Sequence, residues 1–158
     1  MVKSCWKPSI ECDSRGCHDG LLWYKDLGQH VYGDFSMAVI QANGLLEDQS
    51  QLESRSLSSI RSDPYGTFIG VCDGHGGPEA SRFINDNLFC NFKSYVSENQ
   101  DKLINDLRKA FLETEDKFLS LVRKQWSVKP QMASVGSCCL TGMICNGLLC
   151  IACWIKFY

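Results

Sequence analysis

Apolar residues recur along this chain with two different spacings, and these spacings divide it into strands and helices. Alternating apolar and small residues predict a strand over Asp34–Gln41, and the short β-branched run Thr67–Cys72 predicts a buried central strand. The polar segment Asn43–Gly66 joins them, and its serine-rich part Leu52–Pro64 is expected to be a loop. The first half of the chain therefore favours strands that are joined by polar connections.

Two longer segments carry their apolar residues at the spacing of a helix. In the first, from Pro78 to about Val96, the apolar face consists of Ala80, Phe83, Ile84, Leu88, Phe92 and Tyr95. In the second, from Asp101 to Gln125, it consists of Leu103, Leu107, Ala110, Phe111, Phe118, Leu121 and Val122. We interpret both faces as core packing, and the acids Glu113, Glu115 and Asp116 as the solvated face of the second helix.

The segment from Pro130 to Ile155 carries no charged side chain and is long enough to span a bilayer. The pair Asn146-Gly147 near its middle is a strong hairpin signal. Two buried strands, Ser134–Cys145 and Leu148–Ile155, explain the segment better than a spanning helix, which stays the minority interpretation. The order of strands, two helices and strands indicates an α+β fold.

Composition narrows the class of protein. A chain of 158 residues with 44% hydrophobic content can bury the core of one folded domain. A formal net charge of -2 gives no electrostatic case for binding nucleic acid or an anionic membrane. The N-terminus has no apolar stretch typical of a signal peptide, so the ten cysteines are expected to be reduced thiols inside a cell.

Two sets of cysteines have a spacing that could hold a metal. Cys145, Cys150 and Cys153 match part of a plant-type iron–sulfur pattern, although they lie inside predicted strands. A second set near the N-terminus fits no common zinc finger; its members are Cys5, Cys12, Cys17 and His18. We interpret both sets as unrelated thiols, because free cysteine is often a small buried apolar residue.

Asp73 is the leading candidate for chemistry, because it ends the buried strand and is followed by a glycine-rich turn and a helix start. Gly74, Gly76 and Gly77 permit positive φ and a close approach of the backbone to a ligand. Pro78 suits the first position of the helix. A carboxylate held between a strand and a helix could grip Mg²⁺ or Mn²⁺, although an Asp-Gly pair at a strand end is most often a plain turn.

A hard divalent cation needs more oxygen ligands than Asp73 can offer. The nearest upstream carboxylates are Glu47 and Asp48, which follow the first predicted strand. They could meet Asp73 at one edge of a sheet, or they could be solvated loop charges.

The ordered set of motifs resembles the PP2C-type (PPM) metal-dependent protein serine/threonine phosphatases. It comprises Phe35–Met37, Glu47–Asp48, Gly70–Gly77 and Gly136–Ser137. Flanking segments are similar to the plant subgroup called clade D; they are Asp19–Asp26, Phe35–Ala42, Lys124–Trp126 and Val135–Cys139. The resemblance covers about Asp19 to Ile151 and implies half of an α-β-β-α sandwich of antiparallel sheets covered by helices.

The resemblance also implies a role for each matching residue. Asp73 would bridge two Mg²⁺ or Mn²⁺ ions, and Gly74 would offer its carbonyl oxygen to one of them. Glu47 would reach the same ion through water, and Asp48 would order the waters of the metals. His75 would be the general acid for the leaving alkoxide. A metal-activated water would then attack phosphoserine or phosphothreonine in line, without a phosphoenzyme.

Two departures from the family pattern limit these expectations. Where many members carry a phosphate-binding arginine this chain has Asn43, and Arg55 and Arg61 nearby have no assigned place, so the phosphate-binding residue is unknown. The later acidic motifs of the family are also absent. We therefore expect half of a two-metal site and little or no activity from this chain alone.

The resemblance divides the chain into a leader (1–28), a partial phosphatase domain (29–153) and an off-pattern tail (154–158). We interpret the tail as intron read-through, a frameshift or a gene-model error. The last strand would then present an unpaired apolar edge, which favours aggregation.

Three classes of function are retained at this point. The first is a phosphatase acting on serine/threonine phosphoproteins, with possible regulatory proteins, in the nucleus, in the cytoplasm or at the plasma membrane of a plant cell. The second is a non-catalytic fragment that competes with a full-length relative. The third is a membrane or iron–sulfur protein built on the C-terminal cysteines.

Overall fold

A computed structural model describes residues 22–30, 33–41, 44–59, 64–96 and 102–157 of the chain. In chain order its elements are β1 (Leu22–His30), β2 (Gly33–Ile40), β3 (Gln49–Ser56), β4 (Tyr65–His75), α1 (Glu79–Tyr95), α2 (Leu103–Gln125), the short 3-10 helix η2 (Pro130–Ser134), β5 (Gly136–Cys145) and β6 (Leu148–Phe157).

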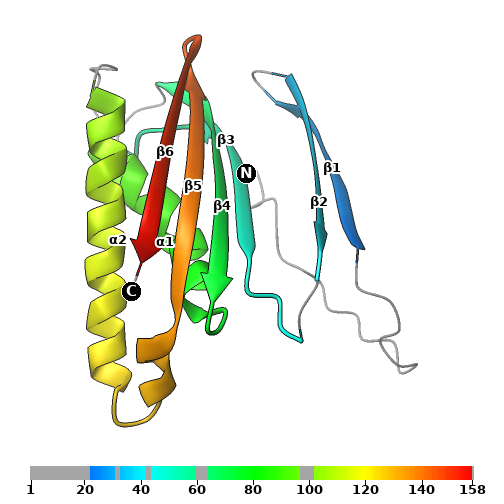
Figure 1. The fold of residues 1–158 in the computed structure, drawn as a ribbon. Coiled ribbons are helices and arrows are strands. Elements are labelled where there is room, and N and C mark those ends of the chain that lie inside the picture. Colours follow the sequence, from blue (N-terminus) through cyan, green and yellow to red (C-terminus); the bar gives the residue numbers. More distant parts are fainter. Residues whose placement is uncertain (1–21, 31–32, 42–43, 60–63, 97–101, 158) are drawn as a thin grey trace.

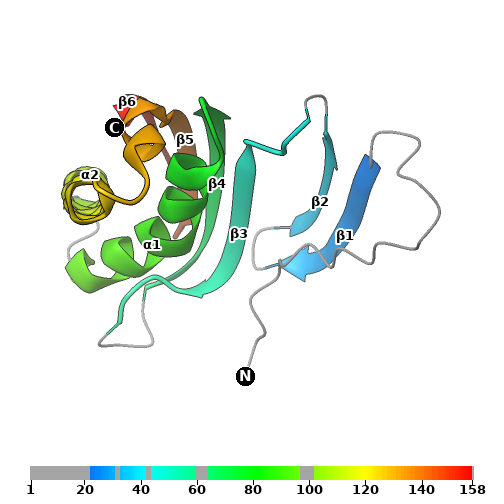
Figure 2. The same ribbon diagram turned by 90° about the horizontal axis from the view of Figure 1, so that it is seen from below.

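The centre of the molecule is a four-stranded antiparallel sheet in the order β3-β4-β5-β6. Helices α1 and α2 cover one face of this sheet (Figure 1). The hairpin β1-β2 forms a separate two-stranded sheet, which lies beyond β3 on the side away from the helices (Figures 1 and 2). The predicted α+β class and the covering of a sheet by two helices are confirmed.

Aromatic side chains join helix α1 to the sheet and to helix α2. Phe68 of β4 lies 5.1 Å from Phe89 and 5.9 Å from Phe92 of α1, measured between ring centroids. Phe83 of α1 lies 5.3 Å from Phe118 of α2. Burying such a side chain contributes about 1.5–3 kcal/mol to the free energy of folding. The apolar faces predicted for the two helices thus contribute to the core of the molecule.

The predicted loop over Leu52–Pro64 is wrong for its first part, Leu52–Ser56, because strand β3 occupies Gln49–Ser56 and pairs with β4. Its polar side chains find partners across the strands: the Ser54 and Thr67 hydroxyls lie 2.9 Å apart. Serine-rich composition favours a loop only while such hydroxyls have no partner.

The predicted uncharged hairpin is confirmed as β5 and β6. Its turn places Asn146 at φ 49 and Gly147 at φ 77, the left-handed conformations that a two-residue type I′ turn requires. No helix in the part of the chain that the structure describes is long and apolar enough to cross a membrane.

Strand β6 continues to Phe157 and so includes most of the expected off-pattern tail. Trp154 pairs with Cys139 of β5, and its ring stacks on Phe111 of α2 at 5.4 Å. At the other end, β1 begins at Leu22, inside the expected leader, and residues 1–21 lie outside the described part. The domain boundaries stay a prediction.

Candidate functional site

The candidate site lies where strand β4 ends. Asp73, Gly74 and His75 are its last three residues and still pair with β5. The side chains of Asp73 and His75 are exposed, and they share one face of the sheet because side chains alternate along a strand. The Ser137 hydroxyl of β5 donates a hydrogen bond of 2.9 Å to the Asp73 carbonyl oxygen. The backbone of this strand end is thus fixed, while its carboxylate faces solvent.

Glu47 and Asp48 approach the same strand end from β3. The first register pair of β3 joins Gln49 to Cys72, so the two acids run on beside Asp73 and Gly74. The Gly74 N–H donates a hydrogen bond of 3.1 Å to Asp48 Oδ1. The structure therefore brings together the two acidic motifs that the sequence predicted to meet.

Gly74 allows this close approach because it has no side chain. A Cβ at this position would collide with the backbone carbonyl oxygen of Glu47. That carbonyl oxygen also accepts a hydrogen bond from the hydroxyl of Ser81, a buried residue in the first turn of α1. Strand β4, helix α1 and the acidic segment are thus joined at one point.

The turn after β4 uses two glycines in conformations that other residues rarely adopt. Gly76 has φ 76 and Gly77 has φ 145. A Cβ at Gly76 would come within 2.6 Å of the Ser134 carbonyl oxygen at the end of η2. Helix α1 then begins at Glu79, with Pro78 as its N-cap. The predicted order of strand, glycine turn and helix is confirmed, but β4 continues beyond Cys72 to His75, and Pro78 precedes the first helical residue instead of occupying that position.

The donor atoms at this site suit a hard divalent cation, since they are carboxylate and carbonyl oxygens. One of these atoms, Asp48 Oδ1, already accepts the hydrogen bond from Gly74. Within the described residues, no three or more His, Cys, Asp or Glu side chains are gathered closely enough to hold a metal ion. The chemistry of the donors fits Mg²⁺ or Mn²⁺, but their number falls short of a complete ligand set.

The structure gives no support to the zinc set, to the iron–sulfur set or to a phosphate-binding role for Arg55. The possible zinc set Cys5, Cys12, Cys17 and His18 and the possible phosphate-binding positions Asn43 and Arg61 lie outside the described residues. Cys150 packs against the core, whereas Cys153 is exposed on the opposite face of β6, so the possible iron–sulfur set does not converge. Arg55 pairs with Glu53 at 3.0 Å and lies over the Phe89 ring, near the end of β4 far from Asp73.

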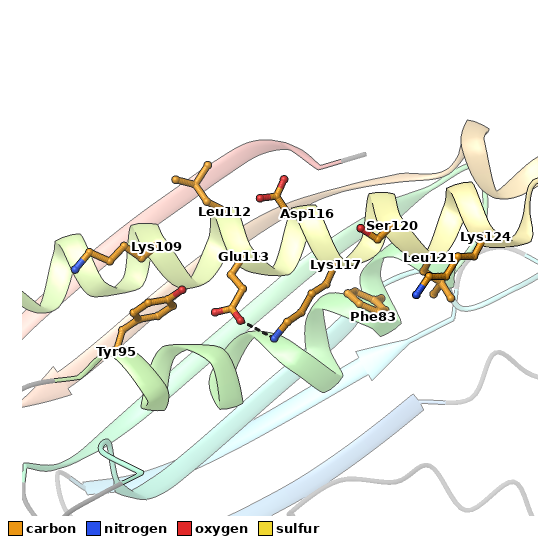
Figure 3. A pocket seen from close by; sticks show the side chains of 10 residues that line it. All are labelled: Phe83, Tyr95, Lys109, Leu112, Glu113, Asp116, Lys117, Ser120, Leu121 and Lys124. Atoms are coloured by element: carbon orange, nitrogen blue, oxygen red, sulfur yellow. Dashed lines mark ion pairs between the residues drawn. The ribbon is translucent and has the colours of Figure 1, made fainter.

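A feature that the sequence did not predict is a hollow of about 730 Å³ along α1 and α2 (Figure 3). Lys117 donates to Glu113 at 2.7 Å and to Asn91 Oδ1 of α1 at 2.7 Å. The hydrogen bond with Lys117 lowers the pKa of Glu113, and the hydrogen bond with Glu113 raises the pKa of Tyr95. This network joins the two helices and includes none of the predicted site residues.

Known proteins that are similar to this chain in sequence are named protein phosphatases. No family model matches it. It is 59% identical, over 96% of its length, to probable protein phosphatase 2C 38 of Arabidopsis thaliana, of which it covers 41%. It is 57% identical, over 95% of its length, to probable protein phosphatase 2C 28 of Oryza sativa subsp. japonica, of which it covers 39%.

A bacterial serine phosphatase of known crystal structure has a similar fold. The TM-score is 0.51 at 17% identity, and the match covers 79% of this chain and 42% of that one. The fold is thus shared with a serine phosphatase. By sequence, nearly the whole chain is similar to plant proteins named protein phosphatase 2C, and it spans about two fifths of the length of the curated relatives named above.

Proposed function

We propose that this chain carries the first part of the catalytic centre of a Mg²⁺- or Mn²⁺-dependent protein serine/threonine phosphatase. The observation that carries the proposal is the meeting of Glu47 and Asp48 with Asp73 and Gly74 where β3 begins and β4 ends. Identities above 50% to proteins named protein phosphatase 2C support the same reaction.

Each residue of the site has a proposed task. The exposed Asp73 carboxylate and the Gly74 carbonyl oxygen would hold the metal, with Glu47 acting through water. Two divalent ions would supply an activated water and would neutralise charge on the phosphoryl oxygens. Asp48 keeps the strand end in place through the Gly74 N–H. His75, on the same face as Asp73, would give a proton to the leaving alkoxide.

A second candidate function is a non-catalytic binding protein. The observation that favours it is that no three His, Cys, Asp or Glu side chains of the described residues lie close enough together to hold a metal ion. Such a chain would keep a docking surface for phosphoproteins or regulators and would compete with a full-length relative. For both candidates we place the partners among serine/threonine phosphoproteins of a plant cell, in the nucleus, in the cytoplasm or at the plasma membrane.

Two measurements on the purified chain separate the candidates: hydrolysis of a phosphothreonine peptide with and without Mn²⁺, and Mn²⁺ binding by calorimetry. Asp73→Asn is the test variant, and Asp86→Asn is the matched control because Asp86 is exposed on α1. Turnover that needs Mn²⁺ and falls at least about 100-fold only in Asp73→Asn supports the phosphatase.

Mn²⁺ binding that depends on Asp73 without turnover supports the non-catalytic candidate. If folded protein shows neither turnover nor binding sensitive to Asp73, the proposed metal site is wrong.

A further inference from the structure

Two buried cysteines face each other across the central pair of strands. Cys72 of β4 and Cys139 of β5 are register partners, and their sulfur atoms lie 2.8 Å apart. Their exposed fractions are 3% and 1%. Directly opposed residues of antiparallel strands have Cα atoms about 4.5–5.5 Å apart, which is inside the range of about 4.4–6.8 Å that a disulfide spans. Bridging this pair requires no large backbone movement.

No other cysteines of the described residues are register partners in this way. Cys138 is next to Cys139 in sequence, but its side chain points to the opposite face of the sheet, and its partner on β4 is Asp73. The remaining cysteines of the described part stand on α1 or face residues other than cysteine; they are Cys90, Cys145, Cys150 and Cys153. The sheet register therefore selects one pair.

We propose that Cys72 and Cys139 form a reversible cross-strand disulfide when the chain meets a peroxide. One sulfur attacks the peroxide oxygen, which gives a sulfenic acid and one water. The second sulfur attacks the sulfenic sulfur, the S–S bond forms, and a second water leaves. Two thiols and one hydrogen peroxide thus become one disulfide and two waters, and a dithiol reductant reverses the bond by exchange.

The position of the pair gives the bond a local consequence. Cys72 directly precedes Asp73, so the disulfide would tie β4 to β5 at the start of the candidate site. The contact with the Cys72 sulfur and burial raise the pKa of the Cys139 thiol, so little thiolate is present and oxidation is slow while the strands stay paired. The expected route for peroxide is an opening of this strand end, where Asp73 and His75 are exposed. None of this requires phosphatase activity.

The test is oxidation of the purified chain with hydrogen peroxide, followed by alkylation of free thiols, digestion without reduction and mass spectrometry. We expect a peptide pair that joins Cys72 to Cys139, about 2 Da lighter than the two reduced peptides together, and that is lost after treatment with dithiothreitol. The tryptic peptide of Cys72 contains no other cysteine, whereas the peptide of Cys139 also carries Cys138, Cys145, Cys150 and Cys153, so fragment spectra must locate the bond at Cys139. The Cys138→Ser variant should keep the bond, and the Cys139→Ser variant should lose it.

A bond from Cys72 to any other cysteine, or no bond in protein that is folded by circular dichroism, would overturn the proposal. Should Cys139→Ser fail to fold, the fragment spectra of Cys138→Ser decide alone, because fragment ions that separate Cys139 from Cys145, Cys150 and Cys153 locate the bond. The disulfide and the phosphatase site fail independently, since this readout needs neither metal nor turnover.

Discussion

At the scale of single residues, the candidate site depends on positions where a side chain is absent as much as on the carboxylates. Gly74 lets the Glu47 backbone approach β4, and Gly76 lets the turn pass under the Ser134 carbonyl. The sequence pointed to these glycines through their place between a strand and a helix. It could not tell which of them needs a positive φ and which needs space: Gly76 and Gly77 have positive φ, and Gly74 needs space.

Replacing Gly74 by alanine should therefore lower stability, since a Cβ meets the Glu47 carbonyl oxygen and comes within 2.9 Å of Ser81 Oγ. We expect a loss of about 1–3 kcal/mol in the free energy of unfolding, measured by urea denaturation. The matched control is Gly142→Ala on β5, where nothing lies within 4 Å of the added Cβ. Equal stability of the two variants would show that the strand end relaxes freely.

At the scale of elements, each helix was predictable from its own periodicity, but the contact between the helices was not. Pro78 to Val96 and Asp101 to Gln125 were expected as helices and are observed as Glu79–Tyr95 and Leu103–Gln125. The polar network that joins them needs Tyr95 and Asn91 of one helix to face Glu113 and Lys117 of the other. No local pattern encodes that alignment, because it depends on how both helices lie on the sheet.

The network should make part of the stability depend on pH through Glu113. Its pKa is lowered in the folded chain, chiefly by the hydrogen bond with Lys117. Its contribution is therefore complete above the ordinary carboxyl pKa of about 4.3 and is lost as the pH falls through the lowered pKa.

The difference in unfolding free energy between wild type and Glu113→Gln should accordingly be largest near neutral pH and should shrink in acid. Because Glu113 is partly exposed, we expect less than about 1 kcal/mol, measured by urea titrations at several pH values. Asp116→Asn, at an exposed position on the same helix, is the control. A difference in unfolding free energy that stays constant at all pH values would contradict the assignment of this pH dependence to Glu113.

At the scale of the whole molecule, the sheet is covered on one face and open on much of the other. Helices α1 and α2 cover one face of the sheet (Figure 2). Four side chains on the other face are at least half exposed: Val71, Leu140, Leu149 and Ile151. Strand β6 pairs only with β5 among the described strands, so the predicted unpaired edge is present. Apolar faces and free edges of this kind favour association.

A charge on this open face should reduce self-association. Ile151 is 61% exposed, so Ile151→Lys should change the free energy of unfolding by less than about 0.5 kcal/mol. We expect less light scattering and a smaller sedimentation coefficient at a given concentration. Ile104→Lys is the control, because Ile104 is 56% exposed on α2, on the helical side. Equal association of both variants would show that the open face is not the cause.

The sequence by itself determined the features that depend on neighbouring residues. The helix periods, the Asn146-Gly147 turn and the strand, glycine turn and helix start around Asp73 follow from local conformational preference. The same order of motifs was enough to indicate the protein phosphatase 2C family.

Only the tertiary structure decided the features that join distant residues. The pairing of β3 with β4 turned an expected loop into a strand and brought Asp48 beside Gly74. The register of β4 with β5 placed Cys72 opposite Cys139. The physical reason is that a register is fixed by the packing of whole strands and helices into one core, and no residue can specify it from its own neighbours.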